Sequence, residues 1–80
     1  MPTIFRENGY RLFFYSNEGD PREPPHVHVQ KGDGEAKVWL EPEVELEESQ
    51  GFNASALRAI LSTIDTNKIQ FLEAWYEHFG

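Results

Sequence analysis

Asn8-Gly9 lies between two short segments in which apolar and polar residues alternate. Asparagine followed by glycine suits the positive backbone φ angles of a type I′ turn, which joins two antiparallel strands through two residues. We therefore predict a β-hairpin with strands over residues 3–6 and 10–15. The expected cross-strand pairs are Arg6 with Arg11, Phe5 with Leu12, and Ile4 with Phe13.

A second hairpin is predicted after a surface loop over Ser16–Pro25, which is rich in proline, glycine and charged residues. His26–Gln30 alternates polar and β-branched residues, and Gly32-Asp33-Gly34 supplies a tight turn into residues 35–40. With Asp33-Gly34 at the centre of the turn, the expected pairs are Val29 with Val38, Val27 with Leu40, His28 with Trp39, and Gln30 with Lys37. Moving the turn by one residue at both ends changes these pairs but keeps every side chain on its face.

Residues 41–48 contain five glutamates, with Val44 and Leu46 alternating between them. This segment is either a short edge strand, whose charges discourage unwanted pairing, or an extended connector. We expect it to end at Gly51.

The last third of the chain is predicted to be helical. Asn53 is a good N-cap, and the spacing of Leu57, Ile60, Leu61 and Ile64 is that of one face of a helix. Asp65-Thr66-Asn67 disfavours a helix interior, so we expect a second helix to begin at Lys68. Such a break would allow two apolar sets to be buried together, namely Phe71 and Trp75, and Ile69, Leu72, Tyr76 and Phe79.

These elements predict a single domain over residues 1–80, with the hairpins and acidic connector in 1–50 and the helical region in 51–80. The fold class is α+β with two layers. An antiparallel sheet of four to five strands is covered on one face by one or two C-terminal helices. Phe5, Leu12, Phe14, Val27, Val29, Val38 and Leu40 are expected to face the helices.

The charge of the chain limits its partners. Fourteen Asp and Glu residues against seven Lys and Arg give a net charge of −7, which would repel a nucleic acid and favours a basic protein surface. The absence of cysteine is typical of a reducing cytoplasm. The sequence contains neither a long apolar run nor the pattern of a signal peptide, and we expect no membrane association.

The sheet face away from the helices is the expected partner-binding surface. A patch of aromatic side chains surrounded by charges is typical of a protein interface, which could also join two copies of the chain. The residues expected there are Ile4, Phe13, Tyr15, His28 and Trp39. A second candidate is the acidic strip, which is either solvated charge or a mimic of nucleic-acid phosphates that binds a basic partner. It consists of Glu41, Glu43, Glu45, Glu47 and Glu48.

His26 and His28 are two apart on a predicted strand and would project to the same face. They could begin a metal site, but a third ligand such as His78 or Glu35 would have to be supplied by the fold, and Lys37 would oppose a cation. A histidine could also serve as the general acid or base of a small nuclease. Because the chain is acidic and its His-x-His motif is incomplete, we expect no metal, no cofactor and no catalytic residue.

Several segments resemble one family: residues 1–15, Pro24-Pro25-His26-Val27-His28-Val29, Lys31–Lys37, Gly51-Phe52-Asn53 and Leu72-Glu73-Ala74-Trp75. The chain is similar to the small bacterial proteins of the domain of unknown function 4160 family. This resemblance implies a cytoplasmic, non-enzymatic protein-binding role beside a second small protein, as in a toxin–antitoxin pair. The long link over residues 17–23 and the acidic residues 41–48 depart from the family pattern. These departures suggest an alternative role as a phage-borne anti-CRISPR inhibitor.

Overall fold

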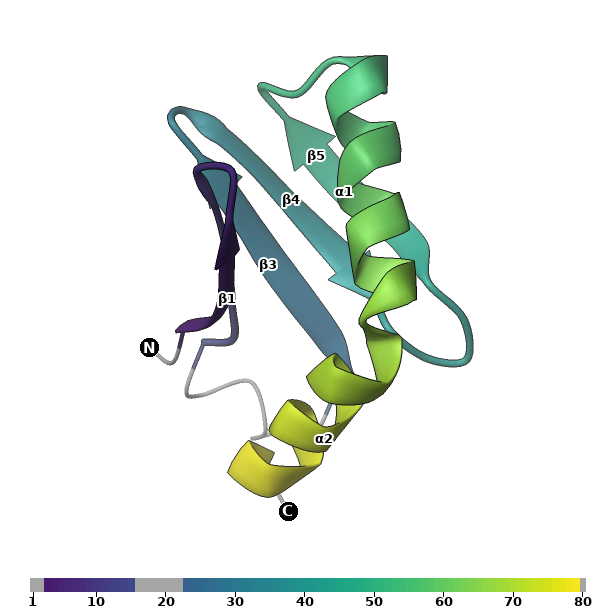
Figure 1. Cartoon of the computed structure of the whole chain (residues 1–80). Helices are drawn as coiled ribbons and strands as arrows, with labels where there is room; N and C mark the ends of the chain where they lie inside the picture. The colour runs from purple at the N-terminus through teal and green to yellow at the C-terminus, as the bar shows by residue number, and fades with distance from the viewer. Residues whose placement is uncertain (1–2, 16–22, 80) are drawn as a thin grey trace.

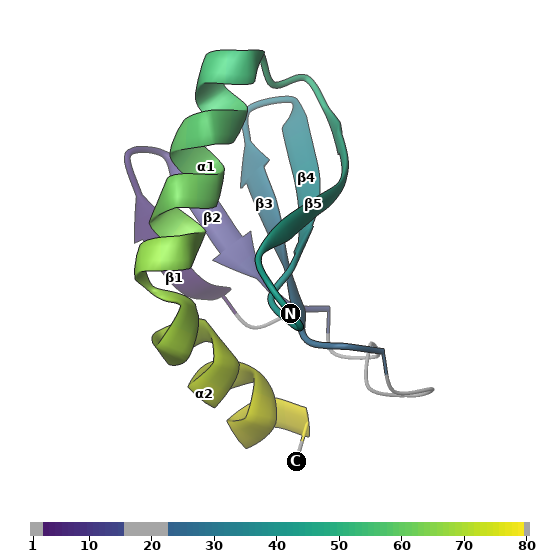
Figure 2. The same cartoon turned by 90° about the vertical axis from the view of Figure 1, so that its right-hand side faces the viewer.

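The computed structural model describes residues 3–15 and 23–79 of the chain. These residues form a five-stranded antiparallel sheet in the order β1-β2-β3-β4-β5, followed by two helices. The strands are β1 (Thr3–Glu7), β2 (Tyr10–Phe13), β3 (His26–Lys31), β4 (Gly34–Trp39) and β5 (Glu45–Gln50), and the helices are α1 (Ala54–Thr66) and α2 (Lys68–Phe79). Both helices lie on one side of the sheet (Figure 1, Figure 2), which confirms the predicted two-layer α+β fold.

The first hairpin turns at Asn8-Gly9, as predicted. The backbone φ angles are 53° at Asn8 and 83° at Gly9, the positive values that a type I′ turn requires. Next to the turn, Phe5 pairs with Leu12 and Arg6 with Arg11 as expected. Farther away an irregularity shifts the register, so Thr3 is opposite Phe13 and the predicted pair of Ile4 with Phe13 is wrong.

The second hairpin turns at Gly32-Asp33, one residue earlier than predicted. Gly32 has a φ of 57°, whereas Gly34 is buried in β4, where the ring of Phe52 packs against it. His28 is therefore opposite Lys37, and His26 takes the expected position of His28 opposite Trp39. The pairs are Val27 with Val38, Val29 with Ala36, and Gln30 with Glu35, and every side chain stays on its predicted face.

Residues 16–22 of the predicted loop lie outside the described part of the chain, and Glu23–Pro25 form neither helix nor strand.

The acidic segment contains an edge strand, which decides between the two alternatives. β5 starts at Glu45, so residues 41–44 form the connector and Gly51 ends the strand. A bulge shifts the pairing between β4 and β5, because Val38 is opposite Leu46 while the neighbouring Lys37 is opposite Glu48. Simple alternation from Leu46 would turn Glu48 toward the helices. The extra residue in β5 instead places Glu48 on the open face, beside Lys37.

The core fills the space between the sheet and the helices. The inner-face residues of the sheet predicted from alternation pack there against Ile60, Ile64, Phe71 and Trp75. Trp75 lies beside His26 at the start of β3 and is completely buried. It contacts Phe14 edge-to-face, with ring centroids 5.1 Å apart. The indole nitrogen of Trp75 is buried and has no hydrogen-bond partner among residues 3–15 and 23–79.

The two helices begin and end where local signals predict. The Asn53 side chain accepts a hydrogen bond from the backbone N–H of Ala56, and the Asn67 side chain donates one to the carbonyl of Thr63 at the break. The expectation that both apolar sets of α2 are buried is wrong, because Ile69 is 71% exposed and Tyr76 is 47% exposed. α2 continues past the end of the sheet (Figure 2), and its buried residues are Phe71 and Trp75.

Candidate partner-binding face

The open face of the sheet is built by alternation along the strands. Leu12, Val27, Val29 and Val38 point toward the helices, so the residues between them point away. Cross-strand pairing then aligns them in rows. One row consists of Phe13 on β2, His28 on β3, Lys37 on β4 and Glu48 on β5.

Three aromatic side chains predicted for this face lie together, and we call Phe13, Tyr15 and His28 the ring cluster. The ring of His28 is stacked with Phe13 at 5.6 Å between centroids and lies 4.6 Å from the ring of Tyr15. The Arg11 guanidinium lies over the Phe13 ring, 4.3 Å from its centre. These contacts leave Phe13 only 4% exposed, although Tyr15 is 41% exposed and His28 is half-buried.

Phe13 is therefore a support for the ring cluster, and the expectation that it offers an exposed surface is wrong. Its side chain is covered on the open face by neighbours that the sequence pattern does not identify as contacts. The side chain of Ile4, which we expected on this face, lies outside the described residues. Tyr15 and His28 present the accessible part of the cluster.

Trp39 lies on the same face but does not stack on His28. Its ring is 5.3 Å from that of His26, which in turn is 5.2 Å from His28, so the rings form a continuous series. The Lys37 ammonium lies 4.6 Å from the centre of the Trp39 ring, and the indole N–H of Trp39 donates to the Glu47 carboxylate. Trp39 remains half-buried, and its orientation is set from both sides.

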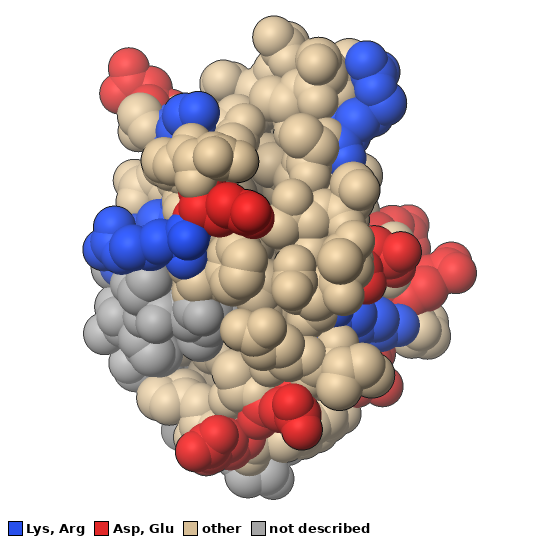
Figure 3. All heavy atoms as spheres, viewed as in Figure 1, with Lys and Arg blue, Asp and Glu red and all other residues tan. Residues whose placement is uncertain are grey.

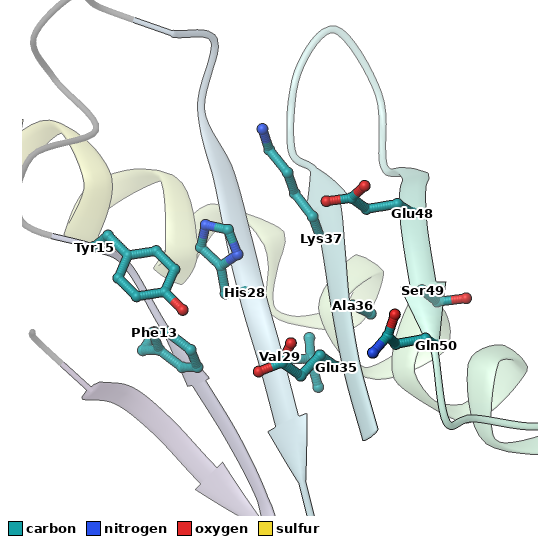
Figure 4. Close-up of a pocket in the computed structure, with 10 residues that line it drawn as sticks. All are labelled: Phe13, Tyr15, His28, Val29, Glu35, Ala36, Lys37, Glu48, Ser49 and Gln50. Atoms are coloured by element: carbon teal, nitrogen blue, oxygen red, sulfur yellow. The ribbon is translucent and has the colours of Figure 1, made fainter. Parts of the chain in front are cut away.

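A hollow of about 170 Å³ opens between the ring cluster and β5. Figure 4 shows Tyr15 and His28 on one side of it and Glu48 and Gln50 on the other. Alternation predicts Glu35 and Lys37 on this face, but it does not indicate that a hollow forms there. Its lining is completed by residues that were not predicted as site residues: Val29, Glu35, Ala36, Lys37, Ser49 and Gln50.

Lys37 crosses the middle of this face. Its ammonium forms an ion pair with Glu23 at 3.1 Å, where the lysine side chain is 18% exposed and the glutamate 40%. Lys37 therefore already has a carboxylate partner on this face.

The predicted acidic strip is divided by the fold. Glu45, Glu47 and Glu48 are exposed along β5, whereas Glu41 accepts a hydrogen bond of 2.7 Å from the hydroxyl of Tyr76 on α2. Glu43 is exposed in the connector. Figure 3 shows several carboxylates at the right-hand side of the molecule, where β5 and this connector lie, and others elsewhere on the visible face. We call Glu45, Glu47 and Glu48 the β5 glutamates.

The two histidines differ in access. His26 is completely buried, its Nδ1 is 2.9 Å from the carbonyl of Pro24, and its ring packs against Trp75. Only His28 borders the hollow. The candidate third ligands do not lie beside the two histidines. Glu35 is opposite Gln30, and His78, on α2, lies near the ring of Phe14. Within residues 3–15 and 23–79, no three His, Asp or Glu side chains could hold a metal ion together.

A model of the DUF4160 family, described as a domain of unknown function, matches residues 9–76. The chain belongs to this family. The matched range runs from the turn of the first hairpin to near the end of α2, so it includes the ring cluster and the hollow. No curated protein and no solved structure matches the chain. Among the described helices, none is long and apolar enough to span a membrane.

Proposed function

We propose that this DUF4160 protein is a non-enzymatic binding module that contacts a small partner protein through the open face of its sheet. The observation that carries the proposal is the exposure of Tyr15, which is 41% exposed, beside the half-buried His28 on the face opposite both helices. Tyrosine and tryptophan bury a large area at a small cost in side-chain entropy. His28 lines the hollow, and the half-buried Trp39 extends the aromatic surface on the same face.

The proposed partner is the small protein encoded beside the chain, as in the toxin–antitoxin-like arrangement that the family resemblance implies. The absence of cysteine agrees with action in the reducing cytoplasm of a bacterium. The net charge of −7 favours a partner with a basic surface, because opposite charges accelerate the encounter of two proteins.

Replacing Tyr15 and Trp39 by alanine tests this proposal. We expect the double variant to bind the neighbouring gene product at least about 100-fold more weakly, since each buried aromatic contributes roughly 2 kcal/mol or more at the centre of an interface. Calorimetric titration of the two purified proteins measures the change, and circular dichroism checks the fold of the variant.

The matched control is the double variant Ile69→Ala and Tyr76→Ala, which removes two exposed apolar side chains from α2. It should bind as the wild type does. Unchanged affinity of the Tyr15→Ala, Trp39→Ala protein, or an equal loss in the control, would show that the open face is not the contact surface.

The exposure of the β5 glutamates supports a second candidate, an inhibitor of a nucleic-acid enzyme such as an anti-CRISPR protein. Carboxylates spaced along a strand could occupy a basic channel in place of phosphates. Since Glu41 is hydrogen-bonded to Tyr76, the accessible acidic surface is Glu43 with the β5 glutamates.

For this second candidate, we expect reversal of Glu43, Glu45 and Glu48 to lysine to abolish inhibition of the target nuclease. Binding to the nuclease should also weaken steeply between low and physiological salt. Alanine at Tyr15 and Trp39 should leave inhibition unchanged. An inhibitor that is insensitive to both salt and charge reversal would contradict this candidate.

A further inference from the structure

We propose that an amphipathic helix of the partner lies over the hollow on the open face, with one apolar flank against the ring cluster and a lysine- or arginine-rich flank against the β5 glutamates. The inference rests on the proposed function and specifies the partner at that site. It follows from three observations: the width of the open face, the different chemistry of the two sides of the hollow, and the charge along β5.

The open face is wide enough for a helix to lie over it and reach both sides of the hollow. The row from Phe13 to Glu48 crosses four strands through the pairs with His28 and Lys37. Three strand spacings of about 4.8 Å separate its ends by roughly 14 Å. A helix with its side chains is about 10–12 Å wide, so it can lie over this row along the direction of β3 and β4. The hollow itself, of about 170 Å³, takes only side chains of such a helix.

The two sides of the hollow differ in chemistry. Tyr15 and His28 form an aromatic side over β2 and β3, whereas Glu48 and Gln50 form a polar side on β5 (Figure 4). The ammonium of Lys37 is held by Glu23 and lies over the Trp39 ring. A helix that meets both sides would therefore need an apolar flank and a separate polar flank.

The charge on β5 indicates the sign of that polar flank. The bulge opposite Lys37 and Val38 places Glu48 on the open face, although regular alternation would have turned it inward. Two further carboxylates extend the same negative side. Glu45 is opposite Trp39 on β4, and Glu47 accepts a hydrogen bond from the Trp39 indole. A flank of lysine or arginine complements these carboxylates, whereas an acidic flank would be repelled.

A second copy of the chain suits this face less well. In a dimer through this face, two hollowed sheet faces would be opposite each other. Two chains, each with a net charge of −7, would also be brought together. Neither shape nor overall charge would then be complementary.

The test uses two stapled helical peptides of about 18 residues with the same leucine flank. One carries lysine on the second flank and the other carries glutamate. We expect the lysine peptide to bind at least about tenfold more tightly than the glutamate peptide in calorimetry. Amide chemical-shift changes on titration should lie on β2–β5, around the hollow.

The variant Glu45→Gln, Glu48→Gln should weaken binding of the lysine peptide by about tenfold. Its affinity for the glutamate peptide should be unchanged or higher. Glu47 is kept because it holds Trp39. The matched control, Glu73→Gln with Glu77→Gln, removes the same charge from exposed positions on α2 and should bind the lysine peptide as the wild type does. In a parallel titration, the lysine peptide should displace the neighbouring gene product.

The inference would be overturned if both peptides bound with equal affinity or if the amide chemical-shift changes were confined to α2. It would also be overturned if the control variant weakened binding of the lysine peptide as much, or if the free protein formed a stable dimer in sedimentation. The proposed function would survive if the neighbouring gene product still lost affinity with Tyr15→Ala and Trp39→Ala while neither peptide competed with it. It would fail if those alanine substitutions had no effect.

Discussion

Trp75→Ala is expected to lower the free energy of unfolding by about 3–5 kcal/mol, the usual effect of removing a buried aromatic side chain. Trp75 is completely buried and contacts Phe14, His26 and Phe79, with ring centroids 5.1, 5.0 and 4.2 Å away. It therefore joins α2 to the lower end of the sheet. A domain of this length has a total stability of roughly 4–12 kcal/mol, so the loss is a large part of it.

Urea denaturation followed by circular dichroism measures this effect, with the neighbouring Tyr76→Ala as the matched control. Tyr76 lies on the same helix but is 47% exposed, and its hydrogen bond to Glu41 is also exposed, so its replacement should cost only about 1–2 kcal/mol. If Trp75→Ala fails to fold, Trp75→Phe should retain a measurable transition, since it keeps a ring and removes the unpaired indole N–H. Equal stability losses at positions 75 and 76 would contradict the role of Trp75.

Gly51→Ala is expected to cost about 2–4 kcal/mol, because a new methyl group there meets both backbone strain and backbone atoms. Gly51 has a φ of 82° at the end of β5. A Cβ atom would lie 2.8 Å from the Cα of Gly34 and 3.1 Å from the carbonyl oxygen of Asp33. Backbone atoms of the neighbouring turn cannot move aside as a flexible side chain would.

Gly32→Ala is the matched control for this second prediction. Gly32 also has a positive φ, 57°, but a Cβ added to it meets no atom within 4 Å in the described part of the chain. Its replacement should cost only the conformational strain, about 1–2 kcal/mol. Denaturation midpoints of the two variants measure the difference, and a Gly51→Ala protein no less stable than Gly32→Ala would contradict the predicted clash.

Local signals predicted much of the fold. The Asn8-Gly9 turn, the Asn53 N-cap and the break at Asn67 depend on backbone preferences and on hydrogen bonds a few residues apart. The side chains of the second hairpin lie on their predicted faces although the predicted register was wrong. Moving the turn by one residue shifts each cross-strand partner by two positions, which preserves alternation.

Other features of the site could not be predicted in this way. The burial of Phe13 depends on Arg11, Tyr15 and His28, which come together only when β2 and β3 pair. The place of Glu48 depends on a bulge that reverses alternation within β5. The exposure of Ile69 depends on where α2 passes the end of the sheet.

The sequence by itself determined the types of element, most turns and caps, and the side of the sheet on which most residues lie, because period-two and period-3.6 patterns follow from backbone geometry. The tertiary structure decided the register of the second hairpin, the apolar stripe of α2 that is buried, and the hollow between the ring cluster and β5. These features arise from packing between residues distant in the chain, as when Trp75 meets Phe14. Packing of this kind depends on the shapes of all neighbouring side chains at once.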